Sequence, residues 1–142
     1  MIVIDQQANK EMIADATQAY PDECCGFLFG NSERDVQTVA LIKAVMNSKE
    51  GDRRRRFLIA PKDYLAAERF AEESKLDLIG IYHSHPDHPA IPSEHDRIAA
   101  QPNFSYIILS VKNGQFDHIS SWRLDEEQQF EQETISNNQL IK

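Results

Sequence analysis

The segment that most constrains the fold of this chain is formed by residues 76–86. Its first half is mostly apolar, and it leads directly into the sequence His83-Ser84-His85-Pro86. A short apolar run of this kind predicts a mostly buried strand. Because side chains alternate between the two faces of a strand, His83 and His85 project to the same side and can share one metal ion. The fold must therefore bury a strand whose end carries two imidazoles, and such a strand is a rigid base for a site.

A third metal ligand can come from Asp96 if the chain turns back after Pro86. Pro89 and Pro92 predict that the intervening segment is a loop. Two imidazoles and one carboxylate suit Zn²⁺ and leave a fourth tetrahedral position for water, which is the arrangement of a catalytic site. A structural zinc site would instead be closed by four protein ligands.

Three segments have the pattern of helices. Apolar residues at helical spacing predict an amphipathic helix over residues 9–19. Pro61 suits the first turn of a second helix with a clear apolar face. Ser93 is a good N-cap, and with Asp96 three residues later it predicts a short helix through Ala100.

The remaining pattern is that of strands. The candidates are residues 26–30, 36–45 and 57–59, with a loop at 47–52. Asn113-Gly114 is the strongest hairpin signal, and it joins predicted strands at 104–111 and 116–122. One edge strand or helix is expected around residues 130–135. This mixture favours an α+β (α/β mixed) fold, with a central mixed, largely antiparallel sheet flanked by helices.

Length and charge restrict the organisation and the partners. A chain of 142 residues can form one domain with a sizeable core but not two, so we predict a single domain over residues 1–142. The formal charge of -8 argues against a nucleic-acid partner. The run Arg53–Arg56 is a local exception, and it is either a solvated loop or a docking patch for an acidic protein partner.

The sequence also bears on compartment. No apolar run approaches membrane-spanning length and the first residues lack a secretory signal, so we expect no membrane partner and a cytoplasmic location. Cys24 and Cys25 are adjacent and therefore poor partners for an ordinary disulfide. We expect small, buried, reduced residues rather than nucleophiles or ligands, since no nearby base is indicated.

Taken together, the residues of the histidine segment resemble the signature of the JAMM, or MPN-plus, zinc metallopeptidases. That signature has a histidine, any residue, a histidine and a proline, then a serine eight positions after the second histidine and an aspartate three further on. The positions that fill it here are His83, His85, Pro86, Ser93 and Asp96. The resemblance implies one Zn²⁺ ion held by His83, His85 and Asp96.

The resemblance extends over roughly residues 10–122. The family has a glutamate near a Cys-Gly pair at the start of a strand, and residues 21–30 resemble that region, which makes Glu23 the candidate catalytic carboxylate. Asn47 and residues 56–61 also look like the family. Glu23 would accept a proton from water and return it to the departing amine. Ser93 could donate a hydrogen bond to the oxyanion that develops on the attacked carbonyl.

Other polar residues near the signature receive structural interpretations. Ser84 lies between the two histidines and should point away from the metal, toward local hydrogen bonds. His88, His95 and His118 are expected in solvent or behind the ligands, with His88 on the loop that borders the substrate.

The resemblance implies hydrolysis of an amide or isopeptide bond after the C-terminal glycines of a ubiquitin-like protein. The chain is compact and looks like the small bacterial members, some of which process sulfur-carrier proteins. The carrier's glycine-rich tail is expected to add as a strand beside the site. Two alternative functions are disfavoured. A non-catalytic MPN-like binding or scaffold module is disfavoured because all the ligand types are retained, and a zinc nucleoside deaminase is disfavoured because its Pro-Cys-x-x-Cys pair is missing. The bond type and the oligomeric state stay open.

Overall fold

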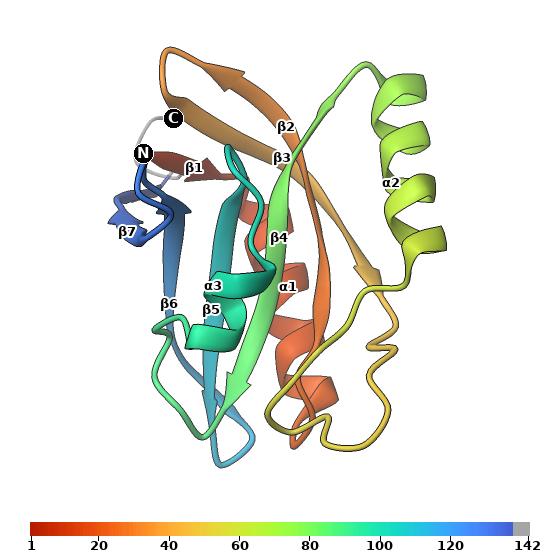
Figure 1. The fold of residues 1–142 in the computed structure, drawn as a ribbon, viewed down its shortest axis with the longest axis vertical. Helices are drawn as coiled ribbons and strands as arrows, with labels where there is room; N and C mark the ends of the chain where they lie inside the picture. Colours follow the sequence, from red (N-terminus) through yellow and green to blue (C-terminus); the bar gives the residue numbers. More distant parts are fainter. Residues whose placement is uncertain (138–142) are drawn as a thin grey trace.

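A computed structural model of the protein describes residues 1–137 and shows a mixed sheet with helices on both faces (Figure 1). Residues 138–142 of the predicted domain lie outside the described part. The elements are β1 (Ile2–Ile4), α1 (Gln6–Ala19), β2 (Cys25–Glu33), β3 (Val36–Val45), α2 (Pro61–Ser74), β4 (Asp77–Pro86), α3 (Glu94–Ala99), β5 (Ser105–Lys112), β6 (Gln115–Leu124), β7 (Phe130–Glu133) and β8 (Ile135–Asn137). Within residues 1–137, no helix is both long and apolar enough to span a membrane.

The sheet confirms the predicted fold class. Its eight described strands follow the order β7-β6-β5-β4-β2-β3-β1-β8. The neighbours β2 and β3, β2 and β4, β5 and β6, and β6 and β7 pair antiparallel. Parallel pairing joins β4 to β5 and β1 to both β3 and β8. Two of the candidate ligands, His83 and His85, therefore lie near the end of β4, in the middle of the sheet.

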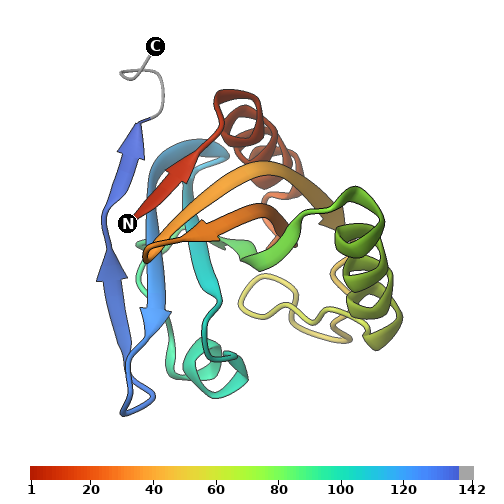
Figure 2. The ribbon, with the colours of Figure 1, turned by 90° about the horizontal axis from the view of Figure 1, so that it is seen from above.

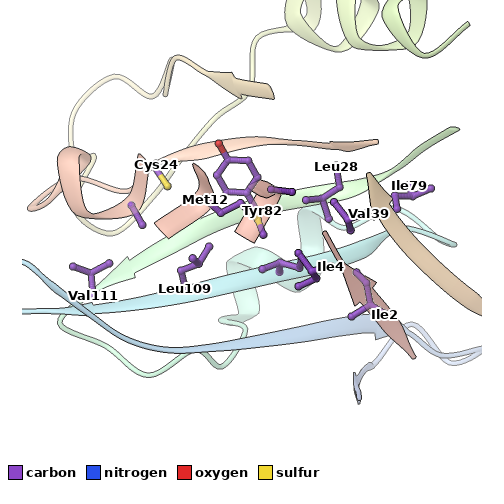
Figure 3. Packing of buried hydrophobic residues seen from close by; sticks show 13 residues of the cluster. Ile2, Ile4, Met12, Cys24, Leu28, Val39, Ile79, Tyr82, Leu109 and Val111 are labelled. Carbon is purple, nitrogen blue, oxygen red and sulfur yellow. The ribbon is translucent and has the colours of Figure 1, made fainter. Parts of the chain in front are cut away.

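Helix α1 covers one face of the sheet. The Asp5 side chain caps it by accepting hydrogen bonds from the backbone N–H groups of Gln7 and Ala8 at 3.0 and 3.2 Å, so the helix begins three residues before the predicted start at Asn9. Its buried residues follow a spacing of four, which places them on one side of the helix. They pack against a core cluster that includes Ile2, Leu28, Val39, Tyr82 and Leu109 (Figure 3).

Helices α2 and α3 lie on the opposite face of the sheet from α1 (Figure 2). Pro61 occupies the first turn of α2, as predicted, and Lys75 ends it in the left-handed conformation. Its small buried residues, Ala67 and Ala71, allow close approach to the second core cluster, which includes Phe27, Phe29 and Ile81.

A bulge in β4 decides which face its side chains use. Leu28 pairs with Gly80 and Phe29 with Leu78, so Ile79 is an extra residue between them. As a result, Ile79 packs in the α1-facing cluster, whereas Ile81 packs in the α2-facing cluster although the two residues are only two apart. After the bulge the period of two resumes. His83 and His85 therefore share the α2 side, as predicted from their spacing, and Ser84 points toward α1.

Some predicted strands differ from the observed ones. Residues 57–59 were predicted as a strand, but they belong to the irregular connection between β3 and α2. Their backbone cannot join β4, because β2 and β5 already flank that strand. The short strand β1 was not predicted. The hairpin around Asn113-Gly114 is confirmed, with φ of 52° and 82° at its two central residues, and residues 130–135 form strands rather than a helix.

Candidate metal centre

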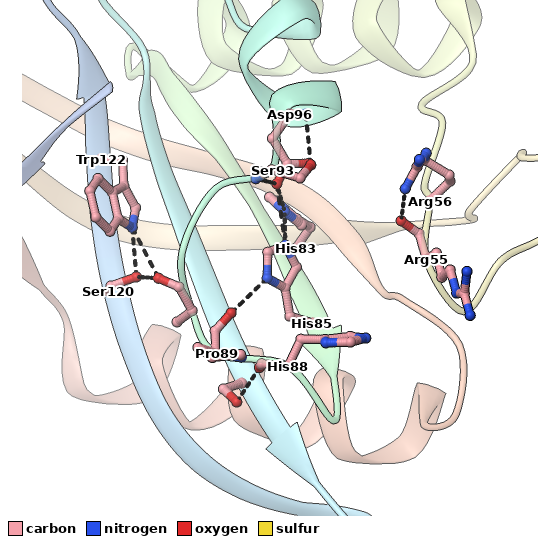
Figure 4. Close-up of polar contacts among 12 residues, drawn as sticks. Arg55, Arg56, His83, His85, His88, Pro89, Ser93, Asp96, Ser120 and Trp122 are labelled. Atoms are coloured by element: carbon pink, nitrogen blue, oxygen red, sulfur yellow. Dashed lines mark hydrogen bonds and ion pairs between the residues drawn. The ribbon is translucent and has the colours of Figure 1, made fainter. Parts of the chain in front are cut away.

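Three donor atoms from two elements meet at the end of β4 (Figure 4). The Nε2 atoms of His83 and His85 are 3.2 Å apart, and Oδ2 of Asp96 on α3 lies 3.4 Å from His83 Nε2 and 3.2 Å from His85 Nε2. Ligand atoms at about 2.0–2.1 Å around one tetrahedral zinc ion would be separated by roughly 3.3–3.4 Å. The spacing and the chemistry of this donor set therefore fit a single zinc ion.

The His83 ring is fixed by burial and stacking. Its side chain is 1% exposed, and the ring stacks on Phe57 with centroids 4.5 Å apart. Burial lowers the pKa of His83, which favours the neutral imidazole that a metal requires. The irregular segment 57–59 thus supports the site although it contributes no ligand.

The His85 ring is oriented by the loop that follows it. Its Nδ1 lies 2.8 Å from the carbonyl oxygen of Pro89. A carbonyl can only accept, so Nδ1 carries a proton, and Nε2 is the ring nitrogen that faces Asp96 and His83. The backbone of Pro89 was not predicted to take part in the site, because a carbonyl contact of this kind leaves no mark on the residue type.

Asp96 is held by the cap of α3. The Ser93 hydroxyl accepts a hydrogen bond from the Asp96 N–H at 3.0 Å, and the Ser93 N–H donates to Asp96 Oδ2 at 2.9 Å. This reciprocal capping box confirms the predicted cap. Burial alone would raise the pKa of Asp96, but hydrogen bonds with the rings of His83 and His85 hold it below the ordinary range. The carboxylate is therefore ionised.

Glu23 lies just before β2 and is 5% exposed. Its backbone N–H donates to the Arg53 carbonyl at 2.7 Å, and its own carbonyl accepts from the Asn47 side chain at 3.1 Å. Among residues 1–137, its Oε1 atom has no hydrogen-bond partner. Burial, followed by the negative charge of Asp96, raises the pKa of Glu23 to about 9. The positive charge of Arg56 opposes this rise only in part, so the carboxyl group holds a proton at neutral pH.

An open cavity of about 400 Å³ brings together three of the predicted residues, Glu23, His85 and Ser93. Its lining comprises Glu23, Arg55, Arg56, His85, His88, Pro89, Ile91 and Ser93. His88 borders this cavity, as predicted from its loop. A second cavity of about 120 Å³ lies on the side of His83 and Asp96, and its lining, which includes Phe57, Ile81 and Tyr106, is mostly apolar. The donor cluster therefore lies between two cavities of different size.

Residues of β6 clamp the loop that orients His85. The Ala90 carbonyl accepts hydrogen bonds from the Ser120 hydroxyl and from Trp122 Nε1, the latter at 3.2 Å (Figure 4). The Ala90 N–H donates to His118 Nε2 at 3.0 Å, which requires the proton of that ring to be on Nδ1, toward Asp117. His118 is exposed, which matches one of its two predicted positions, and it holds the loop through the Ala90 backbone. The roles of Ser120 and Trp122 were not predicted, because they depend on pairing between β5 and β6.

Ser84 and the two cysteines have the structural roles that the sequence predicted. The Ser84 hydroxyl points away from the donor cluster and accepts a hydrogen bond from the Cys24 N–H at 2.8 Å. Cys24 and Cys25 are free and buried. Burial raises the pKa of both thiols, that of Cys25 to about 12, so neither is a ready nucleophile.

The sequence profile of prokaryotic homologues of the JAB domain matches residues 5–125, which includes the whole donor cluster. The chain belongs to this family. Within the JAB family, a desampylase of Haloferax volcanii is 33% identical to the chain over 107 residues, covering 75% of this chain and 73% of the relative. A CysO-cysteine peptidase of Mycobacterium tuberculosis is 27% identical over 127 residues, covering 87% and 83%.

Solved structures agree with the JAB assignment. The solution structure of a protein from Desulfitobacterium hafniense has a TM-score of 0.84 at 29% identity, covering 96% of this chain and 92% of that one. The crystal structure of a JAB1/MPN domain protein from Archaeoglobus fulgidus has a TM-score of 0.55 at 18% identity, covering 96% and 98%. The latter likeness establishes a JAB1/MPN fold.

Proposed function

We propose that this JAB-domain chain is a zinc-dependent peptidase that hydrolyses an amide or isopeptide bond after the C-terminal glycines of a ubiquitin-like or sulfur-carrier protein. The observation that carries the proposal is a cluster of three metal-type donors, one of which, His85, lines the same cavity as Glu23 and Ser93. The names of the relatives, desampylase and CysO-cysteine peptidase, support a hydrolase that acts on carriers of this kind. Two free, buried cysteines fit the reducing cytoplasm.

In this mechanism His83, His85 and Asp96 hold one zinc ion. Zinc in such a site supplies a Lewis acid that lowers the pKa of water from about 16 to about 7. The neutral His83 and the ionised Asp96 are already in the protonation states that a metal requires. Glu23, whose pKa is raised to about 9 mainly by burial, would be ionised beside a bound cation and would then be a base.

Glu23 then moves one proton. Its carboxylate accepts a proton from water as the oxygen attacks the carbonyl carbon of the last glycine, and it delivers that proton to the departing nitrogen as the C–N bond breaks. Ser93 acts at the same moment. Its oxygen lone pair is engaged by the Asp96 N–H, so the hydroxyl hydrogen is available to donate toward an oxyanion in the cavity.

The two cavities suit the two sides of the scissile bond. A glycine tail has no side chains, so the apolar cavity of about 120 Å³ accommodates it, while the cavity of about 400 Å³ receives the departing group. Strand β4 is flanked by β2 and β5, so a tail that adds as a strand would lie along residues 57–59 instead.

The test uses purified protein, its zinc content and a sulfur carrier that ends in two glycines followed by an extension. We expect one zinc per chain and cleavage after the second glycine. Glu23→Gln should keep zinc and lose at least about a thousandfold in kcat, because the variant loses both the proton transfer and the charge stabilisation that the carboxylate provides. Ser93→Ala should lose about tenfold to a hundredfold in kcat with zinc retained, because the Asp96 contact to the Ser93 backbone survives.

Two results would contradict the proposal. One is a zinc-loaded wild-type protein that leaves every carrier intact, which would favour the non-catalytic scaffold module. The other is equal cleavage by Glu23→Gln, which would remove Glu23 from the mechanism.

A further inference from the structure

Two arginines of the 53–56 run line the larger cavity, together with Glu23 and Ser93. Arg55 and Arg56 are in this lining, whereas Arg53 and Arg54 are not. The sequence left this run as a solvated loop or a protein-docking patch. In the structure two of these four arginines line the cavity where the chemistry is proposed, and the other two do not.

The guanidinium groups of Arg55 and Arg56 have weak partners. Among residues 1–137, no carboxylate forms an ion pair with Arg56, whose Nη1 donates to the carbonyl of Arg55 at 2.9 Å. Arg55 approaches Asp52 only at 3.8 Å, and both side chains are well exposed. An exposed ion pair of this kind contributes little to the stability of the fold. The lining of the cavity thus includes two arginines whose guanidinium groups have spare hydrogen-bond donors.

The loop that carries these arginines is tied to the catalytic segment. The Asn47 side-chain amide donates to the carbonyls of Glu23 and Arg56, at 3.1 Å each. The Asn47 oxygen accepts from the Leu58 N–H at 3.1 Å, and the Glu23 N–H donates to the Arg53 carbonyl at 2.7 Å. Arg56 is half-buried, so its backbone is positioned relative to Glu23 rather than free in solvent.

Guanidinium groups match carboxylates in shape as well as in charge, because their N–H donors form a planar fork. In a cavity that receives the departing group, a carboxylate is expected where the leaving amino acid carries its own α-carboxylate. That group lies two bonds beyond the scissile nitrogen. A lysine side chain released from an isopeptide bond presents only methylene groups at the same distance.

We propose that Arg55 and Arg56 bind the free α-carboxylate of the leaving amino acid, so that the enzyme releases a single amino acid from the carrier's last glycine in preference to opening isopeptide bonds. This inference rests on the proposed function. Water adds across the C–N bond, which leaves a glycine carboxylate on the carrier and an ammonium group on the released amino acid. The arginines do not react. They determine which departing group is held.

The first test compares two substrates that differ only at the carboxylate. A carrier ending in Gly-Gly-Ala is offered with a free carboxylate or with a carboxamide. The wild type should cleave the free acid with at least about tenfold higher kcat/KM, as expected for a charge-assisted pair. The double variant Arg55→Gln/Arg56→Gln should lose that preference, so that its kcat/KM values on the free acid and on the amide become equal. Arg54→Gln, an exposed arginine outside the cavity lining, is the matched control and should behave as the wild type.

The second test measures binding without turnover. Acetyl-Gly-Gly-Ala and its carboxamide are titrated into zinc-loaded Glu23→Gln by calorimetry, with and without the two arginine substitutions. The free acid should bind at least about tenfold more tightly, and only when the arginines are present.

The outcomes separate the two proposals. Equal cleavage and equal binding of acid and amide by the wild type would overturn the carboxylate site, and so would an equal loss on both substrates in the double variant. A loss on intact carriers with no loss on short peptides would also overturn it and favour docking of an acidic protein surface. Arginine-dependent binding of the acid by a protein that cleaves nothing would refute the peptidase and leave the carboxylate site standing.

Discussion

At the scale of single residues, Glu23 is required by the proposed mechanism but destabilises the fold when it is ionised. Its carboxyl group is 5% exposed, and its Oε1 has no hydrogen-bond partner in the described part of the chain. Burial raises its pKa to about 9. Between the ordinary pKa of 4.5 and about 9, the folded protein therefore binds one more proton than the unfolded chain, and the free energy of unfolding falls as the pH rises.

Glu23→Gln should therefore stabilise the metal-free protein, increasingly so toward high pH. The amide cannot ionise. The variant therefore avoids the decrease in the free energy of unfolding with pH, which in the wild type reaches at most about 1.4 kcal/mol per pH unit. Urea unfolding in chelator at pH 5, 6, 7 and 8 should show curves that diverge by at least about 1 kcal/mol at pH 8. Glu50→Gln, an exposed position, controls for the lost charge. Parallel curves for wild type and Glu23→Gln would contradict the raised pKa.

The residues of the site differ in how well sequence predicts them. His83, His85, Ser93 and Asp96 follow from local rules, since strand alternation and helix capping act over a few residues. Glu23 is joined to them only by the pairing of Cys25 with His83 across β2 and β4, so its assignment depended on a family resemblance. The position of Arg55 and Arg56 in the cavity was not predictable, because it is set by a loop without periodicity.

At the scale of elements, β6 controls a loop that it does not adjoin in sequence. Ser120 and Trp122 donate hydrogen bonds to the Ala90 carbonyl, and the carbonyl of the preceding Pro89 accepts a hydrogen bond from His85 Nδ1. The hydrogen-bond partners that lie behind a histidine ligand set its tautomer and orientation, and their loss typically weakens metal binding by about 10–100-fold.

The double variant Ser120→Ala/Trp122→Phe should bind zinc about tenfold more weakly, because the clamp acts on His85 through one intervening carbonyl. Competition with a chromophoric chelator measures this affinity. Ser121→Ala is the matched control, since that hydroxyl donates to Glu133 and does not contact the loop. An unchanged zinc affinity, with a lower melting temperature as the only effect, would reduce the clamp to a purely stabilising contact.

Sequence predicts the elements unevenly. Helix α2 and the hairpin at Asn113-Gly114 were predicted correctly because proline and a turn pair mark them locally. Residues 57–59 were wrongly predicted as a strand, since their apolar character serves the stack of Phe57 on His83 and the second core cluster instead. Strand β1 was not predicted, because three residues are too few for a pattern and its stability comes from pairing with β3 and β8.

At the scale of the whole molecule, the donor cluster joins the central strand β4 to helix α3. The sheet order that makes β4 central was not predictable, because residues distant in sequence decide it. Zinc binds the assembled donors far better than the unfolded chain, so it should stabilise the fold by about 4 kcal/mol at a thousandfold excess over its Kd.

Metal removal should therefore lower the melting temperature by about 10 °C, given about 2–4 °C per kcal/mol for a chain of this size. Calorimetry with and without chelator measures the difference. His85→Ala should abolish this zinc dependence, whereas His88→Ala, which lines the cavity outside the donor cluster, should retain it. A zinc-dependent shift that survives in His85→Ala would place the metal elsewhere.

The bulge at Ile79 makes β4 a strand with a phase change. Before the bulge, the even-numbered residue Leu78 faces the α2 side of the sheet. After the bulge the odd-numbered residues face that side, from Ile81 through His83 and His85. The part of β4 after the bulge, from Gly80 to Pro86, pairs with β5 in an unbroken register. Apolar substitutions at Leu76 or Leu78 can therefore alter the lower core without re-aiming the imidazoles. The half of β4 before the bulge contributes only to the core, whereas the half after it carries both core residues, Ile81 and Tyr82, and the imidazoles.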